Sequence, residues 1–446
     1  MKNNIRKRKL CLSSVLTLAL INSFTLLQAQ SAKKLIADLQ AIHTSVRSLP
    51  CNSGQLISNR AMNLFLAEKI GTYLTGYKSI SFYKNNITAD VLNGTFSLSH
   101  NLFQPSGIDK PITSFLVVGV KANVSNTLPS ISNRKTFSND LGATIKKVWI
   151  ATPKTTTNTC LDKNIMDIKR ASIINLLTKE IEEADKAFLQ SLAEIPQDTI
   201  SASDFDQSKK ILQEDFYANL REEFSRKFAA LQYEELASQK RYKRVSTHWT
   251  SVDVYAPIIL KRFVVAEALN VFSRNKKAYA FEGAVSHTRF LESKKVGRLF
   301  ITIEAKAYLN NAADSRLLEY INYHDYKNLG GIDTSSLQQR KISSLFIGHY
   351  KTFVTPAAKF QVAYFPPESH IGISSSIEQH FGTFKTIDWI LGIPVVLINK
   401  IGSPAANFEF QLQYLDLAHH LFPNRTFRDN ISINLTVGIP FSKVIF

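Results

Sequence analysis

The sequence has few of the residues that mark metal sites, redox sites and membrane helices. Only three of its 446 residues are cysteines (Cys11, Cys51 and Cys160), and no pair-and-pair spacing suggests a zinc site. The ten histidines show no ligand spacing, and the glycine-containing stretches match no nucleotide-binding motif. After Leu27, no segment offers about twenty consecutive apolar residues, so no further transmembrane helix is expected. The sequence therefore predicts no metal and no cofactor.

Acidic residues are scarce relative to basic ones. The chain has 54 Lys and Arg against 36 Asp and Glu, a net charge of +18, and loss of residues 1–29 would leave +13. Such a surface suits anionic lipid headgroups, lipopolysaccharide phosphates or anionic solutes. It would suit nucleic acid equally well, but an exported chain argues against nucleic acid as a partner.

Residues 1–29 have the layout of a secretory signal peptide. Five basic residues lie between Lys2 and Lys9, an apolar stretch runs from Leu10 to Leu27, and small residues near Ala29 suit cleavage. The alternative is an uncleaved anchor helix, but six Ser, Thr and Asn residues within the stretch argue against it. An exported chain that spans a membrane without helices must do so as a closed barrel.

About twelve later segments alternate between apolar and polar residues with a period of two. The clearest are FITIEAKAYL (300–309), FEFQLQY (408–414) and the terminal NISINLTVGIPFSKVIF (430–446). The expected strands cover residues 79–84, 90–103, 113–124, 143–151, 245–258, 279–293, 297–310, 353–366, 371–382, 387–399, 407–417 and 430–446. Alternation alone does not choose between a soluble sheet and a membrane barrel, in which the apolar face is turned outward.

Two regions have a helical period instead. Residues 30–78 look partly helical, and we interpret them as an amino-terminal periplasmic segment that acts as a lid or plug. Residues 164–243 predict an antiparallel helical hairpin. Apolar residues that include Ile168, Leu176 and Leu177 mark one face of its first helix, and apolar residues of its second helix, such as Leu212 and Phe216, recur at spacings of three and four. Its residues 164–241 hold 11 basic and 15 acidic groups, a net charge of −4, so the insert differs from its basic surroundings.

Together, the signal peptide, the amphipathic strands and the terminal NLTVGIPFSKVIF resemble an outer-membrane β-barrel protein of a Gram-negative bacterium, of no specific subfamily. The resemblance implies an all-β antiparallel transmembrane barrel, with strands 1–4 in residues 79–163 and strands 5–12 in residues 244–446. In that family the barrel-insertion machinery recognises a carboxy-terminal Phe. The resemblance gives this role to Phe446, with Phe441 on the lipid-facing row.

Counting strands back from the end assigns the connections to sides of the membrane. Short periplasmic turns are expected at residues 292–298, 366–370 and 400–407, and longer external loops at residues 259–278, 311–341 and 418–430. By the same count the helical insert is periplasmic. One miscounted strand in the first half would reverse its side.

Charged and amide residues on the polar rows are candidates for the lumen lining: Glu282, Glu304, Lys306, Glu378, Glu409, Gln411 and Gln413. Paired carboxylates could do acid–base work, but lumen charges more often neutralise one another or line a pore. Twelve-stranded barrels include a phospholipase, which needs a Ser–His pair. Ser286 and His287 are adjacent, so in a strand they point to opposite faces. We therefore expect no enzyme.

Two functions remain open. One is a narrow channel or transporter for small solutes. The other is a non-conducting scaffold or assembly component that docks a periplasmic partner through the hairpin. Cys51 and Cys160 are both expected on the periplasmic side, where they either form a disulfide or remain as two separately buried thiols. A soluble secreted β-protein is the alternative architecture.

Overall fold

The computed structural model describes residues 32–48, 56–71, 85–90, 95–102, 109, 111–123, 141–157, 159–194, 202–239, 242–268, 272–315, 317–329, 337–398, 404–420 and 430–441. The signal peptide (1–29), the strand expected at 79–84, Cys51 and Phe446 lie outside these residues. The chain divides into two compact units. The helical unit comprises Met1–Ala61, Ser106–Lys110 and Thr159–Gln239, and the barrel unit comprises Met62–Pro105, Pro111–Asn158 and Lys240–Phe446.

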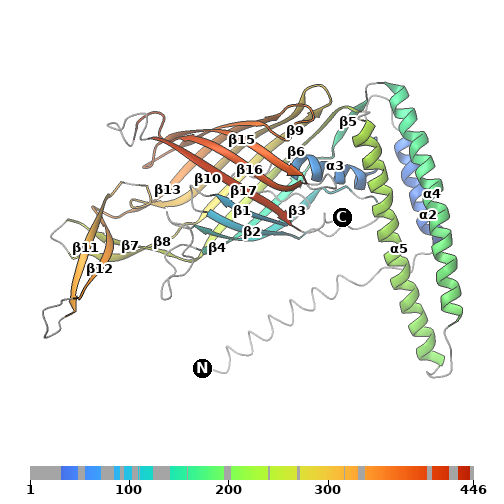
Figure 1. The fold of residues 1–446 in the computed structure, drawn as a ribbon, viewed down its shortest axis with the longest axis horizontal. Coiled ribbons are helices and arrows are strands. Elements are labelled where there is room, and N and C mark those ends of the chain that lie inside the picture. Colours follow the sequence, from blue (N-terminus) through green and yellow to red (C-terminus); the bar gives the residue numbers. More distant parts are fainter. Residues whose placement is uncertain are drawn as a thin grey trace. The chain divides into compact units, whose positions relative to one another are not determined.

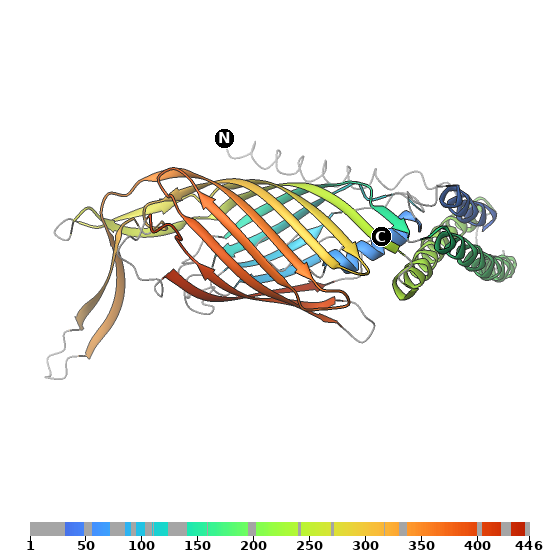
Figure 2. The same ribbon diagram turned by 90° about the horizontal axis from the view of Figure 1, so that it is seen from above.

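Twelve antiparallel strands form a closed ring in the barrel unit (Figures 1 and 2). In order around the ring they are β1 (Asn85–Asp90), β2 (Thr95–Asn101), β3 (Ser114–Asn123), β4 (Leu141–Ile150), β6 (Tyr242–Ile259), β9 (Glu282–Ser293), β10 (Gly297–Asn311), β13 (Thr352–Phe365), β14 (Ile373–His380), β15 (Ile387–Ile398), β16 (Pro404–Tyr414) and β17 (Ile431–Phe441). The ring closes because β17 pairs with β1, from Asn85 opposite Phe441 to Asp90 opposite Thr436. Among the described strands, closure leaves no unpaired edge in this ring. The short β5 (Lys154–Thr157) pairs with the first residues of β6.

The strands turn their polar rows inward and their apolar rows outward. In β17, Asn434 is 2% exposed, whereas the neighbouring Ile433 is 79% exposed. Exposed apolar residues also lie opposite one another across strands, as Ile303, Phe360 and Ile377 do on β10, β13 and β14. A soluble sheet would show the reverse arrangement, so the outer surface has the character of a lipid-facing wall.

The first strand differs from its expected position. The segment that pairs with β17 is NNITAD of β1, and the stretch expected as one strand at residues 90–103 contains the end of β1 and then β2. The count of twelve barrel strands is nevertheless confirmed.

Two long connections contain strands where loops were expected. A four-stranded sheet has the order β11 (Glu319–Leu329), β12 (Leu337–Ile347), β7 (Lys261–Ala266) and β8 (Arg274–Ala278). These strands follow the ends of β6 and β10, so the four-stranded sheet lies at one end of the barrel. The short β9–β10 and β13–β14 connections lie at the opposite end, which we call the turn end. There Gly297 has a φ of 91°, and a Cβ at this position would collide with the backbone of Phe365.

The helical unit contains α2 (Ala32–Arg47), α4 (Cys160–Ala193) and α5 (Ala202–Gln239), and α3 (Asn59–Gly71) is divided between the two units after Ala61. Apolar side chains from α2, α4 and α5 form one core: Leu35, Leu39, Ile42, Ile174, Leu177, Ile181, Leu220, Phe224 and Phe228. The Lys163 ammonium donates a hydrogen bond to the carbonyl oxygen of Arg47 at 2.9 Å. This carbonyl belongs to the last turn of α2, where it has no partner within the helix. Among the described residues, no helix has the length and apolar character needed to cross a membrane.

The amino terminus of α3 is satisfied by a residue from the connection between β2 and β3. The Asp109 carboxylate accepts a hydrogen bond from the Arg60 backbone N–H at 3.0 Å, and the Asn59 side chain donates to the Asp109 carbonyl at 2.8 Å. An acidic side chain at this position caps the helix and interacts favourably with its dipole. These residues all belong to the helical unit.

Candidate functional site

The lumen-facing charges predicted on neighbouring strands come together in one cluster. Lys306 on β10 forms an ion pair with Glu378 on β14. Between them on β13 lies Lys359, whose register partners are Glu304 on one side and Glu378 on the other. The basic and acidic side chains therefore alternate across the wall and neutralise one another. Lys306 also lies near Glu282. The Glu282 Oε2 is in turn 4.0 Å from the Lys121 Nζ.

The cluster continues onto residues that were not singled out from the sequence. His380 Nε2 lies 3.3 Å from Glu378 and 3.3 Å from Asp388, and its Nδ1 lies 3.2 Å from the Tyr308 hydroxyl. His380 and Tyr308 each stand two positions after a predicted lumen residue. Continuing the period-two rows of Glu378 and Lys306 would have found both.

The predicted amide residues form a second, adjoining chain of hydrogen bonds. Gln413 donates to Gln411 at 3.2 Å, Gln411 donates to Glu409 at 3.0 Å, and Asn434 donates to Gln411 at 3.0 Å. The Glu409 carboxylate also accepts from Ser374, and Gly392 leaves the space for it because a Cβ there would collide with both groups. These buried polar groups are thus paired with one another, as interior groups must be.

Aromatic and charged residues fill the turn end of the lumen. Phe290, Phe300 and Phe365 are fully buried, with successive ring centroids 5.0 and 6.3 Å apart. The Arg298 guanidinium lies 4.7 Å from the Phe365 ring and donates to the Ser369 carbonyl at 2.7 Å. Arg298 thereby ties β10 to the β13–β14 connection.

The barrel-unit part of α3 packs into this same end. Phe65 is fully buried and meets Tyr242 edge-on, with ring centroids 5.5 Å apart. The Tyr242 hydroxyl in turn donates to the Glu292 carboxylate at 2.8 Å. The amino-terminal segment was expected to act as a lid or plug, and these contacts show which of its residues pack against the strands.

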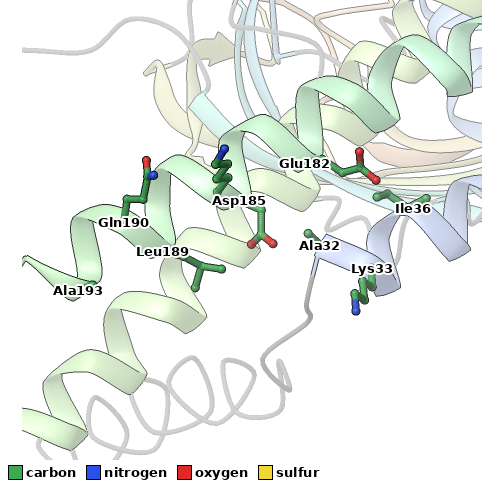
Figure 3. Close-up of a pocket in the computed structure, with 9 residues that line it drawn as sticks. Ala32, Lys33, Ile36, Glu182, Asp185, Leu189, Gln190 and Ala193 are labelled. Atoms are coloured by element: carbon green, nitrogen blue, oxygen red, sulfur yellow. The ribbon is translucent and has the colours of Figure 1, made fainter.

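A groove of about 510 Å³ lies between α2 and α4 in the helical unit (Figure 3). Its walls include Ala32 and Ile36 of α2 and Asp185, Leu189 and Ala193 of α4. Leu189 is 46% exposed, and it lines the groove together with Ala32, the first residue of α2. The groove therefore lies beside the amino-terminal end of α2.

Rigid aromatic contacts support the α4 side of this groove. Phe188 stacks on Phe216 of α5 with ring centroids 3.8 Å apart. The Tyr217 hydroxyl donates to Asp185 at 2.8 Å, and burial together with this carboxylate raises the pKa of Tyr217 to about 12. Asp185 is held in place by a phenol that stays protonated at neutral pH.

Two predicted features are described only in part. Cys160, the first residue of α4, is disulfide-bonded, and the expected partner Cys51 lies outside the described residues. Phe441 ends β17 opposite Asn85, and the side chain of Phe441 is not among those described. Within the described part of the chain, no group of three or more His, Cys, Asp or Glu side chains is placed to hold a metal ion.

Comparison with known proteins adds no family assignment. No protein-family model matches the chain, and no curated protein sequence matches it. Among solved structures, one match is the crystal structure of the β domain of the Bordetella autotransporter Brka. The identity is 7% and the TM-score 0.28, and the alignment covers 80% of this chain and 96% of that one. The closed twelve-strand ring itself fits a generic outer-membrane barrel.

Proposed function

We propose that the protein is an integral outer-membrane barrel that acts as a non-conducting scaffold and presents its helical unit to a periplasmic protein. The filled lumen carries this proposal. Glu304, Glu378, Glu409 and Asn434 point inward, yet each is buried to 9% exposure or less. The lining of a water-filled pore would be more accessible than this. The expected signal peptide supports export, and the apolar outer wall supports insertion in a membrane.

The helical unit supplies the surface for a partner. Ile168 is 69% exposed, Leu176 is 52% exposed, and Leu189 lies at the groove beside α2. These exposed aliphatic residues, together with the groove beside α2, support α4 as the surface that meets a partner. A protein with an apolar contact surface is the proposed partner.

Conductance in planar bilayers tests the proposal. We expect purified wild-type protein to give no discrete openings, because the lumen side chains and Phe65 fill the path. We expect Phe65→Ala to increase leakage, because it removes the aromatic contact with Tyr242 at the turn end. Stable openings by the wild type would instead support the channel, which the polar lumen rows favour as the second candidate.

Co-purification tests the partner surface. Leu189→Glu combined with Leu176→Glu should release a specifically bound periplasmic protein, because it places charges on the apolar face. Asn175→Glu is the matched control, since Asn175 is an exposed polar residue of the same helix. Equal retention by all variants would contradict docking through this face.

A further inference from the structure

A second cavity, of about 570 Å³, lies in the barrel unit against β5, β6 and β9. The side chains that matter here are Lys154, Ser246, His248, His287 and Arg289. They come from adjacent strands, because His248 is the register partner of Arg289, and Lys154 is the register partner of Ser246. The cavity was not anticipated from the sequence, since its residues are dispersed over more than a hundred positions.

These side chains are on the outer face of the barrel. Along β9, His287 and Arg289 are exposed, whereas the intervening Ser286 and Thr288 are buried with the lumen row. His287 is held by Thr250, whose Oγ1 lies 3.0 Å from the His287 Nδ1. The His248 and His287 rings have centroids 5.4 Å apart. The result is a group of nitrogen-bearing side chains on an outward surface, in which a hydrogen bond positions His287.

The position of this group is unusual for a lipid-facing wall. Val285 and Ile303 beside it are exposed aliphatic residues, and Ile303 is the register partner of His287. Trp149, 47% exposed, lies opposite Thr250 on the other side. Tryptophan is enriched where hydrocarbon meets headgroups. A cationic side chain costs little at that depth, but several kcal/mol at the bilayer midplane.

The group also lacks a compensating negative charge. Among the described residues, no acidic side chain lines the cavity, and neither Lys154 nor Arg289 has an ion-pair partner. A guanidinium presents paired N–H donors that match two phosphate oxygens, and an ammonium supplies a compact point charge. The hydroxyl of Ser246 lines the same cavity and offers a further donor.

We propose that this cavity binds the phosphate of an anionic phospholipid headgroup in the membrane leaflet at the turn end of the barrel. The proposal rests on the proposed function in one respect, because it requires that the barrel be inserted in a membrane. The aliphatic residues next to the cavity receive the acyl chains, while Arg289 and Lys154 neutralise the phosphate. Continuity between the cationic cavity and the apolar wall is what selects a lipid over a soluble anion.

Lipid retention by the inserted full-length protein tests this site. The protein is reconstituted in vesicles that contain phosphatidylglycerol and phosphatidylcholine, extracted with mild detergent, and analysed by native mass spectrometry. We expect the wild type to retain phosphatidylglycerol preferentially. Lys154→Gln with Arg289→Gln should reduce that preference roughly 25-fold, at about 5-fold for each cation removed near a membrane surface.

The four-stranded sheet provides a matched control. Arg274→Gln with Lys277→Gln also removes one Arg and one Lys, but from exposed positions of β8 at the other end of the barrel unit. This control should retain the wild-type preference. Heat-modifiable gel migration confirms for every variant that the barrel has inserted.

Three results would overturn the site. Equal retention of both lipids by an inserted wild-type barrel would refute it and leave the proposed function intact. Inorganic phosphate alone, if it lowered lipid retention as much as the double substitution does, would show a free-phosphate site instead of a headgroup site. Failure of the wild type to insert would refute the proposed function, and the site with it.

Discussion

The two units of this protein bury opposite kinds of side chain. In the helical unit, Leu39, Leu177 and Phe228 form an apolar core, as in a water-soluble bundle. In the barrel unit, the buried rows hold Glu304, Glu409 and other polar residues, while aliphatic residues cover the outside. Helices satisfy their own backbone groups and associate by burying apolar surface. A ring of strands satisfies its backbone by closure, which leaves its outer face available to lipid.

The units also differ in how the chain completes them. The barrel ring is joined edge to edge by hydrogen bonds, ending with the pairing of β1 and β17. The helical unit is drawn from separate stretches of sequence, and Cys160 at the start of α4 is disulfide-bonded. We predict Cys51 as the partner, which would join the amino-terminal stretch of this unit to the hairpin covalently.

The largest expected effect is therefore on the helical unit alone. Cys160→Ser should lower its free energy of unfolding by about 4–5 kcal/mol, less any strain, because the reduced unfolded chain gains the entropy of a long open loop. Thermal loss of the helical circular dichroism signal measures this change, and heat-modifiable migration of the barrel should stay the same.

Non-reducing peptide mapping identifies the partner. A peptide that joins Cys160 to Cys51 is expected in the exported protein. Cys11→Ser should change nothing, since Cys11 lies in the predicted signal peptide. A bond from Cys160 to Cys11 would contradict the pairing and also the cleavage of residues 1–29.

A smaller effect, confined to the barrel, is expected from a charge on its outer wall. Phe360→Arg should destabilise the barrel by about 2–4 kcal/mol if the position is near the bilayer midplane, because the guanidinium must leave water. All three tryptophans, Trp149, Trp249 and Trp389, lie on barrel strands, so their fluorescence during urea unfolding in vesicles reports this unit. Phe360→Leu is the control, and should cost far less. Equal costs for both would contradict the lipid-facing orientation of β13.

The smallest expected effect is a pH-dependent change in the free energy of unfolding, caused by the titration of Asp109. Burial raises the pKa of Asp109 from 3.8 to about 6, against the opposing hydrogen bonds from Arg60 and Asn59. The folded state thus binds the proton more tightly than the unfolded state. Protonated Asp109 therefore stabilises the folded state relative to the unfolded state. This stabilisation is complete below about pH 4 and is lost as the pH rises through about 6, on the order of 2–3 kcal/mol in total.

Asp109→Asn separates this effect from other titrations. The variant cannot ionise at this position, so its unfolding free energy between about pH 4 and 7 should fall less than that of the wild type. The helical circular dichroism signal, followed in urea at several pH values, is the measurement. An identical pH dependence in both proteins would show that Asp109 does not control it.

Much of the barrel was predictable because its strands alternate strictly. FITIEAKAYL and FEFQLQY have one polar and one apolar row, and β10 and β16 contain these segments. β1 was not predictable, since NNITAD is short, has Ile87 as its only large aliphatic residue, and includes two Asn, which strands disfavour. Pairing with the long strand β17 determines its conformation instead.

The lumen residues were predictable as a row but not as a network. Which side chains meet depends on register, and register between strands far apart in sequence cannot be deduced from alternation. The hairpin shows a related limit. Ile168 and Leu176 were assigned to the packed face of α4 but are exposed, while Arg170 is buried there. Arg170 is accommodated because it donates to the Leu56 carbonyl and pairs with Asp167 at 3.0 Å.

The order of these pieces along the chain constrains the sequence of folding events. Every residue of the helical core has been synthesised once Gln239 has been added, when only the first four ring strands exist. The seam between β1 and β17 requires residues up to Phe441 and is the contact of greatest sequence separation in the ring. Contacts of this kind form slowly because a long loop must first be closed. The helical core, whose residues all precede β6 in the chain, is therefore expected to form before the seam between β1 and β17 closes the ring.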